Sequence, residues 1–217
     1  MKPKTSLFGG LAFAALLALP ANSYAAFTVF TSEATFLAAV TAPGVDTFAG
    51  VSTSVQTPSP IARAAGPYPY SASSTTSFFG VGTAANPALS TNVDTDVITF
   101  FDIGGGANAI GGFFFGSSTL GEFVTATVVL TATDSLGATS TQTVSAAPTS
   151  FLGFVSTGTI VSLVFSTAMP GEFIFPTVDN LTIAVAKVTA VPEPESLGLL
   201  LAGLAALGVV ARRKRPR

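Results

Sequence analysis

The sequence predicts an all-β fold: an antiparallel β-sandwich of the jelly-roll type with one short N-terminal helix. Short runs rich in Val, Ile, Thr and Phe recur about every eight to twelve residues between turn residues, which is typical of a sandwich. Phenylalanine supplies 19 of the 217 residues and is expected to fill the space between two sheets. No cysteine is present, so packing and not disulfide bonds must stabilise the fold.

The first expected elements alternate between strand and helix. Residues 27–30 alternate in polarity like a first strand, and residues 32–40 follow as a short helix. Thr31 or Ser32 is expected to cap this helix. Its apolar stripe consists of Phe36, Leu37 and Val40. Pro43 and Gly44 are expected to end it, and residues 45–48 to resume as a strand.

The next region is expected to be rich in loops, and the β signal becomes strong only after residue 97. Prolines punctuate residues 52–87, where residues 77–81 form the best candidate strand. Residues 134–137 (Asp-Ser-Leu-Gly) predict a turn, and the glycines of residues 109–116 indicate a bulge or a close backbone approach. The later strands are expected at residues 97–101, 109–116, 123–133, 138–144, 150–155, 159–166 and 178–185.

Composition excludes several classes of function. Between residues 26 and 190, two basic side chains stand against nine acidic ones, a net charge of −7. This balance excludes nucleic-acid binding through phosphates. Without histidine or cysteine there is no Ser-His-Asp triad, no cysteine nucleophile and no zinc or haem site of the usual kind. The domain is therefore expected to be non-catalytic, with glycoside hydrolysis by paired carboxylates as the least favoured reading.

Two groups of residues are candidates for ligand binding. Asp94 and Asp96, together with Asp102 and Asp179, offer carboxylate oxygens of the kind that calcium prefers. The alternatives are solvated loop acids and, for Asp179 with its neighbour Asn180, a turn cap before the last strand. Tyr68 and Tyr70 lie on a stiff Pro-rich segment and are candidates for stacking on sugar rings, with packing against the domain as the alternative. These residues predict, as an alternative function, a calcium-assisted, lectin-like module.

The N-terminal segment has the pattern of a secretory signal peptide over residues 1–25. Lys2 and Lys4 precede an apolar run at residues 7–19. Ser23 and Ala25 place small residues at the −3 and −1 positions, so cleavage is expected after Ala25. A retained N-terminal helix is the alternative. The folded domain is then expected to cover residues 26–190.

The C-terminal segment, residues 191–217, consists of three physically different pieces. It begins with Val191, Pro192, Glu193, Pro194 and, after one residue, Ser196. Residues 197–211 carry no charge and would rise about 22 Å as a helix, a marginal length for crossing a bilayer. A basic cluster that favours the cytoplasmic side of a membrane closes the chain: Arg212, Arg213, Lys214, Arg215 and Arg217. A permanent membrane anchor is the alternative interpretation.

These pieces resemble the PEP-CTERM sorting signal, which exosortase-type membrane proteases recognise; the same motif occurs in the so-called ice-binding protein C-terminal domain. The resemblance implies that the hydrophobic helix enters the inner membrane and that exosortase cleaves near residues 192–194. It further implies that Glu193 and the prolines carry recognition, and that residues 212–215 set the topology. More loosely, residues 100–102, 133–137 and 178–182 are similar to the β-sandwich body of many PEP-CTERM proteins, and this resemblance implies a galactose-binding-like jelly roll. We therefore expect an exported structural or adhesive protein of the cell surface or exopolysaccharide matrix.

Overall fold

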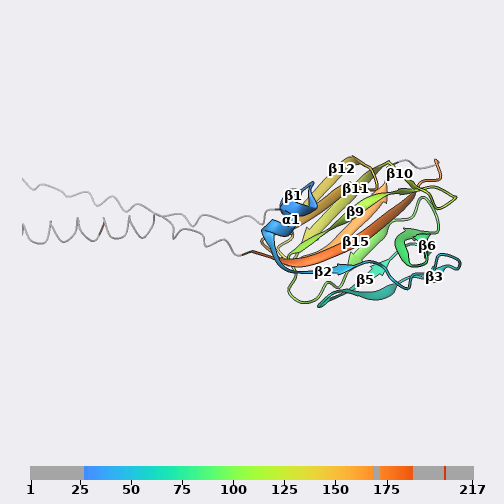
Figure 1. The fold of residues 1–217 in the computed structure, drawn as a ribbon. Helices are drawn as coiled ribbons and strands as arrows, with labels where there is room; N and C mark the ends of the chain where they lie inside the picture. Colours follow the sequence, from blue (N-terminus) through green and yellow to red (C-terminus); the bar gives the residue numbers. More distant parts are fainter. Residues whose placement is uncertain (1–26, 169–171, 188–202, 204–217) are drawn as a thin grey trace, which may run out of the picture.

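The computed structural model describes residues 27–168, 172–187 and 203, and it shows two antiparallel β-sheets packed face to face (Figure 1). The all-β sandwich expected from the sequence is confirmed. The expected signal peptide and nearly all of the C-terminal segment lie outside the described residues. Within the described part of the chain, no helix has the length and apolar character needed to cross a membrane.

The larger sheet has nine strands and the smaller sheet has six. Along the nine-stranded sheet the order is β1 (Phe27–Phe30), β13 (Phe151–Ser156), β9 (Ala109–Ser117), β15 (Phe175–Ala186), β7 (Asn86–Thr91), β6 (Ser77–Thr83) and β3 (Thr57–Pro58). In addition, β10 (Phe123–Val124) pairs with β9, and β2 (Val40–Asp46) pairs with β15. The six-stranded sheet has the order β12 (Thr139–Ala146), β11 (Ala126–Asp134), β14 (Ile160–Thr167), β8 (Ile98–Phe101), β5 (Tyr68–Ser73) and β4 (Ile61–Ala65).

Phenylalanine fills the space between the sheets, as expected. Phe114 of the nine-stranded sheet meets Phe165 of the six-stranded sheet edge to face, with ring centroids 5.1 Å apart. Apolar side chains alternate inward along each strand, so that Leu130 of β11 is fully buried while Thr131 lies on the opposite face. The fully buried phenylalanines of this core are Phe48, Phe78, Phe100, Phe114, Phe154 and Phe165.

The strands expected after residue 97 are present, with small shifts of their ends. One expected strand, residues 123–133, is divided: β10 pairs with the nine-stranded sheet and β11 belongs to the six-stranded sheet, so the chain changes sheets between them. The expected turn at residues 134–137 is confirmed, because Gly137 adopts φ 82° and its N–H donates to the Asp134 carbonyl.

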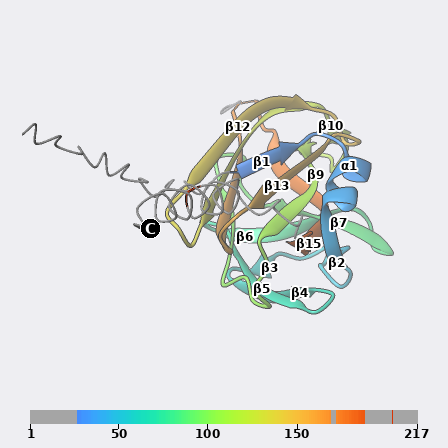
Figure 2. The same ribbon diagram turned by 90° about the vertical axis from the view of Figure 1, so that its left-hand side faces the viewer.

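The short helix is confirmed as α1 (Glu33–Ala39), which packs on the outer face of β9 and β13 (Figure 2). Phe36 is fully buried there, whereas Leu37 of the expected apolar stripe is exposed. Ser32 occupies the N-cap position without a side-chain hydrogen bond; its carbonyl instead accepts from Thr35 Oγ1. A Cβ at Gly153 would lie 2.6 Å from Phe36 Cδ2, so this glycine makes room for the helix.

The expected loops between residues 52 and 87 are wrong, because residues 57–91 form β3 to β7. The prolines sit where the sheet does not need their missing N–H groups. Pro58 is in β3, which is an edge strand. Pro69 lies beyond the β5–β8 pairing, which covers residues 71–73, and Pro87 lies beyond the β7–β15 pairing at residues 89–90. The expected strand at residues 77–81 is confirmed as β6.

Two further expectations are corrected at β2 and β15. Pro43 and Gly44 do not separate helix from strand; β2 starts at Val40 and runs through them, with an irregularity in its pairing to β15. Asp179 and Asn180 do not precede the last strand but lie inside β15, at a bulge. Asn180 adopts φ 49° there, and its N–H donates to Asp179 Oδ1 at 2.8 Å.

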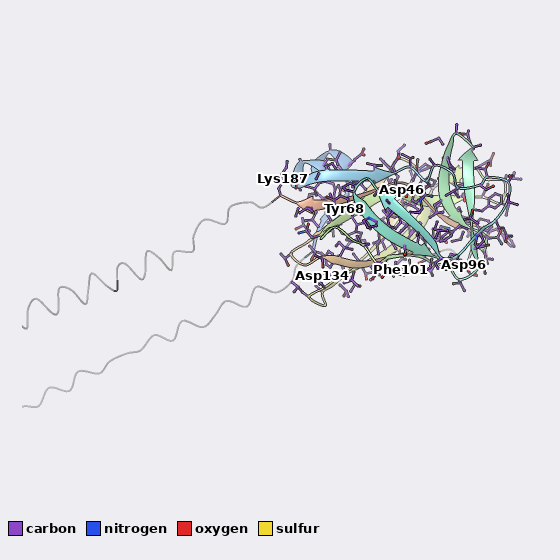
Figure 3. The ribbon with its side chains drawn as sticks, turned by 90° about the horizontal axis from the view of Figure 1, so that it is seen from below. Asp46, Tyr68, Asp96, Phe101, Asp134 and Lys187 are labelled. Carbon is purple, nitrogen blue, oxygen red and sulfur yellow. The ribbon has the colours of Figure 1, made fainter. Side chains whose placement is uncertain are left out.

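Both ends of the described sandwich lie at the same end of the molecule. Phe27 pairs with Ser156, whose N–H donates to the Asn108 carbonyl. The Asn108 side chain in turn accepts from the N–H of Ala186, one residue before Lys187. Lys187 and Asp96 are found at opposite ends of the domain in Figure 3.

The two sheets come together closely at the edge formed by β2, β4 and β5. A Cβ at Gly44 would lie 2.0 Å from the carbonyl oxygen of Ala65, and a Cβ at Gly66 would lie 2.9 Å from Gly44 Cα. Only glycine at position 44 permits this approach between β2 of one sheet and the β4–β5 turn of the other. The backbone contact brings Asp46 of β2 over Arg63 of β4.

A buried ion pair ties the sheets together at this edge. Asp46 is 5% exposed, and Arg63 binds both of its oxygens, with Nε–Oδ2 at 2.6 Å and Nη2–Oδ1 at 2.7 Å. Tyr70 Oη of β5 donates to Asp46 Oδ2 at 2.6 Å, and the N–H of Phe48 donates to Oδ1 at 2.7 Å. The guanidinium also lies over the Phe48 ring, 5.4 Å from its centroid. We call Asp46, Arg63 and Tyr70 the edge network.

Burial alone would raise the pKa of Asp46, but the hydrogen bonds from Arg63 and Tyr70 outweigh this effect and lower it. Burial and the neighbouring Asp46 carboxylate raise the pKa of Tyr70, so its hydroxyl stays protonated and remains a donor. The edge network therefore combines a permanently charged donor, a neutral donor and a carboxylate.

We predict that Asp46→Asn lowers the free energy of unfolding by about 3–5 kcal/mol, because it leaves the Arg63 charge without its partner. Tyr70→Phe should cost about 1–2 kcal/mol, since only one hydrogen bond is lost. Urea unfolding of the single variants and of Asp46→Asn/Arg63→Gln measures the coupling. If the losses in free energy of unfolding from the Asp46 and Arg63 substitutions were additive, the ion pair would not stabilise the contact between the sheets.

The edge network also predicts a pH dependence. Because the pKa of Asp46 is lower in the folded than in the unfolded chain, its stabilisation is complete above the unfolded value of about 4. It is lost as the pH falls through the folded value. The melting temperature of the wild type should therefore fall more steeply below about pH 4 than that of Asp46→Asn. Circular dichroism melts measure this, with Asp102→Asn as an exposed control; parallel curves for all three would refute the assignment.

Candidate functional site

The four aspartates expected to bind calcium do not form a common site among the described residues. Asp96 is 4% exposed, and its Oδ2 accepts from Ser74 Oγ, from Thr76 Oγ1 and from the Thr76 N–H. Asp102 is exposed with φ 52°, and Asp179 sits in the β15 bulge, where burial raises its pKa. Asp94 is half-buried. In residues 27–168 and 172–187, no three acidic side chains come together as a metal site.

The tyrosine pair does not offer ring faces for sugar stacking. Tyr68 is 4% exposed and Tyr70 is 2% exposed, and both belong to the main core. Tyr68 Oη donates to the carbonyl of Ala42 at 2.9 Å, and Tyr70 is part of the edge network. Alternation along β5 turns both rings inward, so the expected exposed pair is corrected to the packed alternative.

Sequence reasoning did not single out Asp134 as a buried acceptor. Together with Asp46 and Asp96, it is one of three deeply buried carboxylates of the described chain that accept several hydrogen bonds. It is 2% exposed and accepts from the N–H groups of Leu136 and Ala138 and from Ser156 Oγ. Burial opposes ionisation, but these hydrogen bonds together lower the pKa of Asp134. Leu136 and Ala138 belong to the β11–β12 connection, whereas Ser156 is the last residue of β13, so Asp134 holds this turn and links the end of β11 to the end of β13.

The structure reveals a cleft that the sequence did not indicate. It has a volume of about 420 Å³ and lies on the outer face of the nine-stranded sheet, between β6 and the β9–β10 turn. Val81, Ala88 and Phe115 form a small cluster beneath this region, separate from the main core. The cleft therefore has its own apolar support on the face of the sheet that points away from the six-stranded sheet.

Three buried hydroxyls lie at the floor of the cleft, and we call them the floor hydroxyls: Ser90, Ser117 and Thr177. They are 1%, 1% and 0% exposed and come from β7, β9 and β15. Thr177 Oγ1 lies 2.9 Å from Ser90 Oγ and 2.8 Å from Ser117 Oγ, and the two serine oxygens are 3.2 Å apart. Ser90 and Ser117 line the cleft directly. A pattern of single serines in strands gives no sequence signal for this convergence.

A second hollow of about 550 Å³ lies between the start of α1 and the β12–β13 connection. Glu33 of α1 and Ser145 of β12 are among its lining residues, and both side chains are exposed. The buried floor hydroxyls belong to the first cleft, which makes that cleft the better-built candidate for ligand binding.

We predict that calcium leaves the stability of the domain unchanged. The Asp96 carboxylate already accepts three hydrogen bonds, and among the described residues no group of three or more acidic side chains assembles to supply the six to eight oxygens that calcium takes. The melting temperature should agree within about 1 °C in millimolar calcium and in chelator. A calcium-dependent rise of several degrees that Asp96→Asn abolishes would restore the calcium-assisted alternative.

Comparison with known proteins identifies one segment of the chain. Residues 190–215 match the family model described as the PEP-CTERM protein-sorting motif. The match contains Pro192, Glu193 and Pro194, the uncharged run and four of the basic residues. No curated protein and no solved structure matches the chain. The chain therefore carries a PEP-CTERM protein-sorting motif, which indicates an exported protein that is sorted to the cell surface and processed by exosortase.

Proposed function

We propose that the β-sandwich is a non-catalytic adhesive or structural component of the cell surface or of the exopolysaccharide matrix. In this proposal the sorting motif enters the inner membrane, residues 212–215 stay in the cytoplasm, and exosortase cleaves near residues 192–194. The motif at residues 190–215 supports the delivery route. The surface chemistry of the six-stranded sheet supports the adhesive role.

The outer face of the six-stranded sheet is a continuous array of uncharged residues, which we call the threonine face. One row across β12, β11, β14, β8 and β5 is Thr141, Thr131, Val164, Thr99 and Ser73. The adjacent row is Thr139, Thr133, Ser162, Phe101 and Ser71. Inward partners such as Leu130 and Leu163 are fully buried, which fixes these rows on the outside.

No residue in either row carries a charge, although the domain as a whole is acidic. A charged side chain must be stripped of strongly held water before it contacts a neutral polymer, which costs free energy. Removing water from hydroxyl and methyl groups costs much less free energy than removing it from a charge. These groups also match the hydroxyls and C–H groups of a polysaccharide. Thr131 and Thr141 already hydrogen-bond across strands at 2.9 Å, so the array is partly ordered before it meets a partner. The single observation that carries the proposal is this uncharged hydroxyl surface on an exported protein.

We predict that charges on the threonine face reduce retention of the processed protein on the producer's exopolysaccharide. Thr141 and Thr143 are exposed on the edge strand β12, where substitution should spare the core. Thr141→Glu/Thr143→Glu and Thr141→Lys/Thr143→Lys should each lower the retained fraction at least about fivefold, because either sign must be desolvated. Retention is measured by immunoblotting after washing.

The matched control is Thr28→Glu/Val55→Glu, which adds the same charge at exposed positions away from the threonine face. It should retain wild-type binding. Loss with the Glu pair alone would indicate bulk repulsion from an acidic polymer. Equal retention of all variants would contradict the proposed role of the threonine face.

A further inference from the structure

We propose that the cleft between β6 and the β9–β10 turn binds an uncharged saccharide, with Ser90 and Ser117 as hydrogen-bonding partners of its hydroxyl groups. The inference deepens the adhesive role proposed above and rests on it for the presence of a polysaccharide partner. The site is distinct from the threonine face, because it lies on the other sheet. The hydroxyls at the floor of the cleft, its apolar walls, its uncharged lining and its hydrogen-bonded rim support the inference.

The floor hydroxyls can both donate and accept. Ser90 Oγ is 3.3 Å from the carbonyl of Pro176, and Thr177 Oγ1 is 3.1 Å from that of Phe175. Three further contacts join the hydroxyl oxygens to one another, so the floor has five contacts within hydrogen-bond distance. Only three hydroxyl protons are present to fill them. Rotating one hydroxyl therefore turns Ser117 from a donor into an acceptor toward the cleft without leaving a buried group unpaired. A sugar hydroxyl, which also donates and accepts, fits such a floor.

Apolar groups flank the floor. Phe79 of β6 pairs across strands with Ser90, and Phe175 of β15 pairs with Ser117, so each serine has an aromatic neighbour. Both rings are half-buried and line the cleft. Leu120 stands at the rim and is 83% exposed. Alternating hydroxyl and apolar contacts are what a pyranose ring offers, since its hydroxyl edge and its C–H face point in different directions.

The cleft is uncharged in an acidic domain. Among the residues that the structure describes, its lining consists of Gly, Ser, Thr, Asn, Phe, Val and Leu, without Asp, Glu, Lys or Arg. A phosphate, carboxylate or cationic ligand would lose its hydration there without gaining a counter-charge. The volume of about 420 Å³ falls in the usual range for small-ligand sites, about 300–1,000 Å³. These two properties together favour a short stretch of neutral saccharide.

The rim is held in place before a ligand binds. In the β9–β10 turn, Ser118 Oγ accepts from the N–H groups of Leu120 and Glu122, and the Ser118 N–H donates to the Glu122 carbonyl. Phe123 of β10 contacts Phe115 with ring centroids 4.9 Å apart. Such pre-organisation lowers the entropy cost of binding.

The inference is tested by calorimetric titration of the processed protein with neutral tetrasaccharides of glucose, galactose and mannose. A tetragalacturonate serves as the charged probe. We expect at least one neutral tetrasaccharide to bind and the charged probe to bind at least about tenfold more weakly. Leu120→Asp and Ser117→Ala should each weaken binding of the neutral probe about tenfold, the first by adding a charge at the rim and the second by removing a floor hydroxyl.

Leu136→Asp is the matched control, because Leu136 is also an exposed leucine in a turn, 63% exposed, but lies outside the cleft. Its affinity should equal that of the wild type, and melting curves of all variants confirm folding. The inference is overturned if no neutral tetrasaccharide binds, or if Leu120→Asp and Leu136→Asp bind alike. Matrix retention measured on the same variants separates the two proposals. Retention without tetrasaccharide binding overturns the cleft alone, and tetrasaccharide binding without retention overturns the adhesive role alone.

Discussion

The contact between the Asp46 carboxylate and the Arg63 guanidinium is the constraint on which the rest of the sandwich depends. A two-sheet fold has open edges, and at this edge the backbones approach so closely at Gly44 that no apolar side chain can be inserted to hold them. A bidentate ion pair with a tyrosine hydroxyl is short, directional and fully hydrogen-bonded. It can therefore hold the two backbones together where a bulky apolar side chain has no room. It fixes the position of β2 relative to β4, and therefore the register in which the two inner faces meet.

Much of the fold follows from local sequence patterns, but the candidate site does not. The β11–β12 hairpin is predictable because the inward Val128, Leu130 and Ala132 alternate with a β-branched residue at every other position, and a turn ending in Gly137 follows. Apart from β6, the strands between residues 57 and 91 are not predictable, because their prolines are tolerated only through the positions of the neighbouring strands. The burial of Tyr68 and Tyr70 likewise depends on β4 and β8, whose pairing with β5 no local pattern reveals.

The floor hydroxyls are an even clearer case of a feature that local sequence patterns do not predict. Ser90, Ser117 and Thr177 are separated by 27 to 87 residues, and each is an ordinary strand residue in its own segment. Only the antiparallel order β7–β15–β9 brings them together. The sorting motif is the opposite case, since its recognition elements are contiguous in sequence and are identified without any tertiary structure. In this chain a contiguous segment identifies the sorting motif, whereas the candidate site is assembled only by the strand order of the folded domain.

The ends of the described chain and the cleft lie at opposite ends of the domain. Phe27 and Ala186 meet around Asn108, at the start of β9, whereas Ser117 and the cleft lie at the other end of the same strand. Nine residues of β-strand span about 30 Å, so the strand works as a rigid spacer of that length. The motif that begins at residue 190 follows Lys187 after two residues. While the chain is held through that motif, the cleft therefore lies at the end of β9 that is farther from the tethered end of the domain.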